Sequence, residues 1–242
     1  MKYLRGDASC LPFLLLFYGS WIGSVPKVFI MKPNQENVSA EISESGLILT
    51  VTAAEHPNFV GLLNAGFMVN IRVGESVKTL VCDRLGMDEA YFDERVQTLF
   101  LDSKPVDDPA TASVKNGSIL ALSAAMPGLV GAVFRKGGKY RGMRGSITHP
   151  DENDVTAGKT GWVTVKLFNL ILKELGPFFL GANIWLKGET IQAFFADRFS
   201  RLAGDIQSVN LNGKELAPQA LLKIENEEEP VYIKIVTDQL NP

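Results

Sequence analysis

An internal repeat constrains the fold of this 242-residue chain more than any other feature of its sequence. Read from Gly161 onward, the sequence predicts a strand, a loop, a short strand, a helix, a strand, a tight turn and a last strand that ends near residue 236. An upstream segment, residues 46–123, follows the same order. Two segments that share one order of elements predict two copies of one structural unit.

The two copies match in short phrases rather than along their whole length. Each upstream phrase has a counterpart at the same place in the order, and the unequal spacing predicts loop insertions. The pairs are GLILTV (46–51) with GWVTVK (161–166), PNFVG (57–61) with PFFLG (177–181), MVNIRVGES (68–76) with NIWLKGET (183–190), TLFLDSKPVDD (98–108) with VNLNGKEL (209–216), and NGSILALS (116–123) with the last strand around Tyr232.

Each copy is expected to hold one amphipathic helix. The downstream helix has Thr190 as its expected N-cap and Gly204 as its terminator, and the upstream helix has Ser76 as its cap. The apolar stripes at helical spacing are Ile191, Phe194, Phe195, Phe199 and Leu202 downstream, and Val77, Leu80, Val81 and Leu85 upstream. Asn212-Gly213 predicts a hairpin turn after the downstream helix, and Asp102-Ser103 takes its place upstream.

A helix that crosses one face of a mixed sheet accounts for this order of elements. The hairpins pair locally, and the crossover through the helix makes the first and last strands of each copy parallel neighbours. Val163, Val165 and Leu167 alternate onto the side that meets the helix, so each copy is expected to bury its own core. We therefore predict an α+β chain of two tandem β-grasp (ubiquitin-like) domains, each with one main helix and a mixed sheet of about four or five strands.

The copies also set the expected domain boundaries. Two domains agree with the length of the chain, because each copy is large enough to hold a core. The expected parts are an N-terminal apolar segment and linker (1–45), the first β-grasp domain (46–132), a basic glycine-rich connector (133–160) and the second β-grasp domain (161–242).

Three phrases of the downstream copy resemble one branch of the β-grasp superfamily. The phrases are VTVKLFNLILKELG (163–176), GETIQAFF (188–195) and VNLNGKEL (209–216), and the branch is that of the sulfur carriers. It includes the small subunit of molybdopterin synthase and the sulfur carrier of thiamine biosynthesis. The resemblance covers most of residues 161–236 and, more faintly, residues 46–132.

Sulfur carriers act through a C-terminal Gly-Gly whose carboxylate is adenylated and converted to a thiocarboxylate. Glycine is needed because the tail threads into the activating enzyme, where a Cβ would clash. Here the second copy ends in Asn241 and Pro242, and the first copy continues past Gly131-Ala132. The resemblance therefore implies a non-catalytic, sulfur-carrier-like protein that binds a partner protein of molybdenum or tungsten cofactor pathways or of sulfur transfer. The alternative is a sulfur carrier activated by proteolysis, for instance after Gly138.

Composition and motifs argue against an enzyme. A net charge of −3 gives no general attraction to nucleic acid. Cys10 and Cys82 cannot form a disulfide framework or a four-thiolate metal site, and the apolar stretch around Cys82 is typical of a buried residue. His56 and His149 each lie beside a proline in a loop-like context, and the sequence contains no phosphate-binding loop or GxGxxG motif. We predict no catalytic residue, no metal and no cofactor.

One segment does not read as an ordinary linker. Residues 124–134 are small and apolar, and the ten residues after them carry five cations and no acid. A glycine-flexed basic arm suits an anionic partner surface, a phosphate-bearing ligand or RNA, with Tyr140 available for stacking. The alternative is a connector whose charges face water. We expect a protein partner, with an RNA- or phosphate-binding module as the alternative function. The predicted partner-binding residues are Met126, Pro127, Gly128, Leu129, Val130, Arg135, Lys136, Gly137, Gly138, Lys139, Tyr140, Arg141 and Arg144.

The N-terminal segment bears on the location of the protein. Residues 11–23 form an apolar run that is shorter than the roughly 20 apolar residues of a spanning helix. The run resembles the core of a signal peptide but lacks a small-x-small cleavage site. A buried strand or helix, or an extension upstream of a start at Met31, are the other interpretations. We expect a cytoplasmic protein, exported only if residues 1–30 are a signal peptide.

Overall fold

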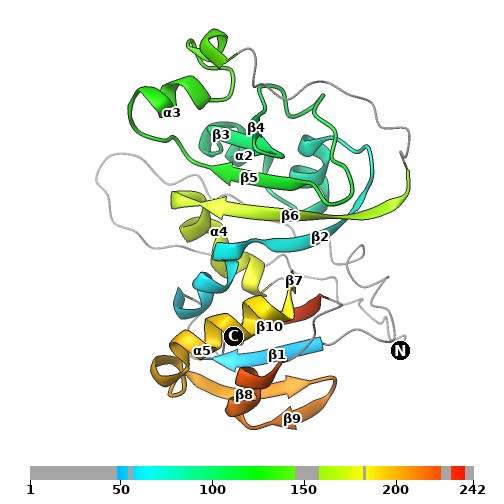
Figure 1. Ribbon diagram of the computed structural model, residues 1–242, viewed down its shortest axis with the longest axis vertical. Coiled ribbons are helices and arrows are strands. Elements are labelled where there is room, and N and C mark those ends of the chain that lie inside the picture. Colours follow the sequence, from blue (N-terminus) through cyan, green and yellow to red (C-terminus); the bar gives the residue numbers. More distant parts are fainter. Residues whose placement is uncertain (1–47, 54–56, 145–157, 182–183, 225–229, 238–242) are drawn as a thin grey trace, which may run out of the picture.

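The computed structural model describes residues 48–53, 57–144, 158–181, 184–224 and 230–237, which form a mixed α+β structure around one ten-stranded sheet (Figure 1). The strands are β1 (Ile48–Ala53), β2 (Phe67–Arg72), β3 (Thr98–Leu101), β4 (Lys104–Pro105), β5 (Ile119–Ser123), β6 (Thr160–Phe168), β7 (Ile184–Leu186), β8 (Ile206–Leu211), β9 (Lys214–Leu216) and β10 (Val231–Thr237). The helices are η2 (Pro57–Ala65), η3 (Thr79–Arg84), α2 (Glu89–Arg95), α3 (Gly128–Phe134), η4 (Arg141–Arg144), α4 (Asn169–Gly181), α5 (Gly188–Leu202) and η5 (Pro218–Lys223).

The sheet has two halves of the same plan that meet at its centre. Its strand order is β4-β3-β5-β6-β2-β7-β10-β1-β8-β9. We call the strands from β4 to β2 the first half and those from β7 to β9 the second half. Each half has a hairpin at its outer edge, then a parallel pair, then a strand at the seam, where Met68 of β2 pairs with Trp185 of β7. The mixed sheet agrees with the prediction, but it is one sheet of ten strands rather than two small ones.

The parallel pairs join strands from different copies of the repeat. β5 runs parallel to β6, with Leu120 opposite Val165, and β1 runs parallel to β10, with Val51 opposite Ile235. The prediction that the first and last strands pair within each copy is therefore wrong, because each copy gives its first strand to the other half. Alternation sets which face of a strand is buried, but it does not choose between two apolar partners.

One face of the sheet holds the core. Alternating side chains of β3, β5, β6, β2, β10 and β1 point to that face, among them Leu99, Leu122 and Val163. The buried side chains form a single cluster that runs through both halves. The expectation that each copy buries a core of its own is therefore not met. The ten-stranded sheet gives both copies one continuous hydrophobic layer.

Residues 169–181, which were predicted to be a loop, form helix α4. Ile171, Leu175 and Phe179 lie four residues apart and are buried on one side of the helix. Pro177 lies inside the helix, although proline lacks the backbone N–H of a regular helical position. A Cβ added at Gly176 would lie 2.9 Å from a methyl carbon of Val60, so the glycine lets α4 approach η2 closely.

The predicted turns are confirmed, and the caps are confirmed in part. Asp102 and Ser103 have φ values of 50° and 67°, and Asn212 and Gly213 have values of 52° and 81°, so both hairpins turn through two left-handed residues. The Ser76 hydroxyl accepts a hydrogen bond from the backbone N–H of residue 79, at 3.1 Å. The N-cap predicted at Thr190 is wrong, because α5 begins two residues earlier, at Gly188, and Lys187 occupies the N-cap position without a side-chain hydrogen bond.

Within the described residues, no helix is both long and apolar enough to cross a bilayer. The apolar run of residues 11–23 lies outside the described residues.

Candidate functional site

The predicted basic segment leaves the sheet at the end of β5 and returns through η4. We call residues 124–144 the arm. Figure 1 shows the arm at one end of the molecule, beside β3 and β5. Met126 to Val130, which were predicted to bind a partner, lead into helix α3, which begins at Gly128. A Cβ on Gly131 would lie 2.0 Å from the carbonyl oxygen of Met126, so only glycine lets the chain double back here.

The inner side of the arm is fixed to the hairpin strand β3 and to helix α2. Phe134 packs on Phe100, with 5.3 Å between the ring centroids. The backbone N–H of Lys136 donates to the carbonyl of Gln97 at 2.7 Å. The ammonium of Lys136 lies 4.4 Å from the centroid of the Phe92 ring, which is a cation–π contact. These contacts hold the middle of the arm against the first half of the sheet.

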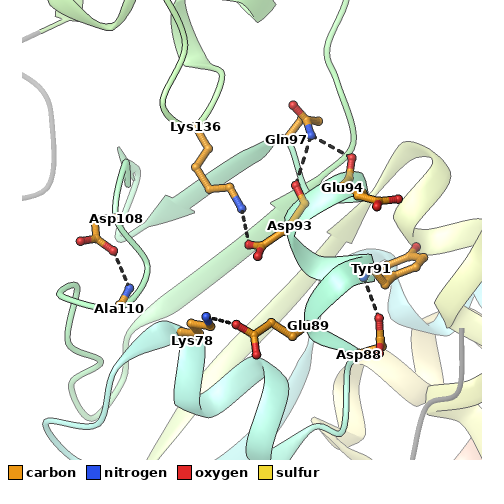
Figure 2. A network of polar contacts seen from close by, with 10 residues as sticks. All are labelled: Lys78, Asp88, Glu89, Tyr91, Asp93, Glu94, Gln97, Asp108, Ala110 and Lys136. Atoms are coloured by element: carbon orange, nitrogen blue, oxygen red, sulfur yellow. Dashed lines mark hydrogen bonds and ion pairs between the residues drawn. The ribbon is translucent and has the colours of Figure 1, made fainter.

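Lys136 also reaches an acid of α2. Its Nζ lies 3.6 Å from a carboxylate oxygen of Asp93, which is an ion pair but too long for a strong hydrogen bond (Figure 2). Burial lowers the pKa of Lys136, and the nearby Asp93 carboxylate opposes that change only in part. The side chain is 15% exposed, so its charge faces the protein rather than solvent. Lys136, which was predicted to contact a partner, has the position of an anchor inside the structure.

A second anchor closes the arm. Arg144 is 2% exposed, and its guanidinium donates to Asp107 Oδ1 at 2.6 Å and to the carbonyl of Val133 at 2.7 Å. The N–H of Gly137 donates to the same Asp107 oxygen at 3.1 Å. One carboxylate thus joins the beginning and the end of the basic run. Arg144 therefore has a structural role in the arm, although nothing in the sequence distinguishes it from the neighbouring cations.

The remaining residues of the arm face solvent. Arg135, Lys139 and Arg141 are exposed, and none of them forms an ion pair within the described chain. Seven large hydrophobic side chains of the described residues are exposed, and four of these belong to the arm: Leu129 at 65%, Val130 at 64%, Tyr140 at 44% and Met143 at 70%. We call the three exposed cations and these four exposed apolar residues of the arm its outer face.

The predicted site residues take different positions in the structure. The outer face contains six of them, while Lys136 and Arg144 are anchors. Gly137 and Gly138 form the turn between these anchors, since the N–H of Gly138 donates to the carbonyl of residue 135 at 3.0 Å. Met126 is half-buried below α3, and residues 127–128 are exposed at its start. Sequence reasoning missed Met143, although an apolar residue in a run of cations is a readable signal.

Helix α2 and its neighbours form the base to which the arm is fixed. The Asp88 carboxylate caps α2 by accepting from the N–H of Tyr91 at 2.8 Å (Figure 2). Gln97 donates to the carbonyl of Glu94 at 2.8 Å at the other end of the helix. Lys78 pairs with Glu89, which joins α2 to η3. The base is therefore held by polar contacts as well as by the buried Phe92.

The groups that could serve catalysis give little support for chemistry. Burial raises the pKa of the Cys82 thiol to about 11, so the reactive thiolate is scarce at neutral pH. Among the described residues, no cluster of three or more histidine, cysteine, aspartate or glutamate side chains could hold a metal ion. His56 and His149 lie outside the described residues.

Comparison with models of known protein families, with curated protein sequences and with solved structures gave no match for this chain.

Proposed function

We propose that this protein is a non-catalytic binding module, and that the outer face of its arm binds a partner protein. The module consists of two β-grasp units that exchange their first strands. In this interpretation β6 completes the unit that contains β2, β3, β4 and β5, and β1 completes the unit that contains β7 to β10. The parallel pairing of β5 with β6 and of β1 with β10 supports the exchange.

The exposure of apolar side chains on an anchored arm carries the proposal. Four large apolar side chains of this short segment are exposed to water, and a partner that covers them lowers the free energy of the complex. The inner contacts of Phe134, Lys136 and Arg144 fix the backbone, so binding requires little additional ordering. Tyrosine, methionine and arginine are also the side chains that protein interfaces favour.

The partner class comes from the sequence resemblance. Because three phrases of the downstream copy resemble sulfur carriers, we propose a partner from molybdenum or tungsten cofactor pathways or from sulfur transfer. The raised pKa of Cys82 agrees with a non-catalytic role, because this thiol is a weak nucleophile at neutral pH.

Site-specific photo-crosslinking in the native host tests the proposal. A photo-reactive amino acid replaces Val130, which is exposed on the arm, or Gln219, which is exposed in the second half. We expect one protein to be crosslinked from position 130 and not from position 219. The same products from both positions, or none from position 130, would contradict the proposal.

The processed sulfur carrier remains a separate prediction. In the intact chain the N–H of Gly137 is bound to Asp107, and that of Gly138 to the carbonyl of residue 135, so this glycine pair forms a turn rather than a tail. Intact-mass measurement on protein from native cells decides the matter. A product that ends at Gly138 would favour the carrier over the binding module.

A further inference from the structure

We propose that the partner surface is acidic around its rim and apolar at its centre; this inference rests on the proposed function. The outer face of the arm combines the two properties that such a surface would complement. Its apolar side chains lie on α3 and near η4, which are in contact with each other. Two of its cations, Arg135 and Lys139, lie on the segment that joins these two helices, and Arg141 is the first residue of η4.

The inner anchors leave the outer cations without compensation. Asp107 forms an ion pair with Arg144, and Asp93 forms an ion pair with Lys136. No other acid occurs between residue 108 and residue 144. Arg135, Lys139 and Arg141 therefore project a local positive charge from a chain whose net charge is −3. Charges at the edge of an interface steer association and select partners of opposite sign.

The apolar side chains favour a protein over a nucleic acid. Leu129, Val130 and Met143 are each more than 60% exposed. A phosphate backbone has no apolar surface that could cover them. Tyr140 alone has a ring that could stack on a base. An apolar hollow lined by a partner's side chains would cover all four. Aliphatic and aromatic anchors at the centre of an interface are where most binding free energy arises.

A charge-reversal triple variant tests the acidic rim. It carries Arg135→Glu, Lys139→Glu and Arg141→Glu. The matched control carries Arg201→Glu, Lys214→Glu and Lys223→Glu, which are exposed residues of the second half and give the same change in net charge. With the purified protein that is crosslinked at position 130, we expect the arm variant to bind roughly 10-fold more weakly at low salt. The control is expected to bind as the unmodified chain does, and the difference between the two should shrink as salt screens the charges.

Leu129→Ser tests the apolar centre in the same assay. We expect roughly 30-fold weaker binding, about 2 kcal/mol, with an unchanged dependence on salt. Thermal unfolding of each variant confirms that the exposed substitutions leave the fold intact. Membrane and RNA binding are tested separately, by mixing the chain with phosphatidylcholine vesicles that contain phosphatidylserine and with single-stranded RNA.

Each outcome separates this inference from the proposed function. A crosslinked partner whose affinity ignores salt and the arm variant would overturn the acidic rim and leave the binding module standing. Failure to crosslink any protein, together with vesicle or RNA binding that requires the arm cations, would overturn both. A crosslinked partner that binds in a salt-dependent manner, and that is weakened by both arm changes, supports both.

Discussion

At the scale of single residues, the arm shows that like residues can have unlike roles. Lys136 and Arg144 belong to the same basic run as Arg135 and Arg141, yet the first two point inward and the other two face water. Burial beside Phe92 or Asp107 makes the difference, and both of these residues lie outside the run. A cation near an aromatic ring or a carboxylate gains a contact that offsets part of its desolvation.

Gly131→Ala tests the close approach inside the arm. The new Cβ would overlap the backbone of Met126, so α3 must shift. We expect the free energy of unfolding to fall by about 1–3 kcal/mol, measured by urea titration. Gly142→Ala is the control, because nothing lies within 4 Å of its Cβ position. Equal stability of the two variants would show that the arm does not double back as described.

Lys136→Met tests the buried ammonium through its pH dependence. The folded pKa of Lys136 lies below its ordinary value of 10.5. Between the two pKa values the unfolded chain binds more protons, so this residue makes the free energy of unfolding rise with pH in that window. The variant lacks the contribution. We therefore expect the unmodified chain to gain stability relative to the variant as pH rises toward 10.5, and a constant difference would refute the burial of Lys136.

At the scale of elements, a polar contact joins α2 to α4 across the core side of the sheet. The hydroxyl of Tyr91 donates to Glu174 at 2.6 Å, and Arg95 pairs with the same carboxylate. Burial and this hydrogen bond raise the pKa of the Tyr91 phenol, which stays neutral at physiological pH. Helix α2, to which the arm is fixed, is thereby tied to α4.

Tyr91→Phe removes one bond of that contact and keeps the ring. We expect a loss of about 1 kcal/mol in the free energy of unfolding, since Glu174 retains Arg95. Tyr140→Phe serves as the control, because that hydroxyl belongs to an exposed side chain. A double-mutant cycle with Glu174→Gln isolates the coupling. Additive effects in the cycle would mean that Tyr91 and Glu174 do not interact.

Local elements were predictable where the signal is local. The turns at Asp102-Ser103 and Asn212-Gly213 and the cap at Ser76 depend on residues adjacent in sequence, and they are confirmed. Helix α4 was not predicted, and its close packing against η2, where Gly176 lies beside Val60, is set by the tertiary fold. The inward anchors of the arm were missed because Asp93 and Asp107 are brought to it only by the tertiary fold.

At the scale of the whole molecule, strand exchange makes the two copies depend on each other. β6 lies between β2 and β5, and β1 lies between β10 and β8. Strand partners of this kind cannot be predicted from alternation, because the apolar face of each strand fits either copy. The repeat was visible in the sequence, whereas the exchange is a choice between two pairings with similar side chains.

Fragments test this dependence. Residues 1–144 lack β6, and residues 145–242 lack β1, so each is expected to leave a strand-wide gap in its own half and to fold poorly alone. Produced together, the two fragments should co-purify as a complex with equal amounts of each. Two fragments that fold separately and ignore each other would point to independent domains.

Cross-strand backbone NOEs in the isotopically labelled protein test the central claim most directly. We expect NOEs that connect Leu120 and Leu122 of β5 to Val165 and Leu167 of β6, and NOEs that connect Val51 of β1 to Ile235 of β10. NOEs that instead connect β5 to β1 and β6 to β10 would show that each copy keeps its own first strand, and would contradict the exchanged sheet.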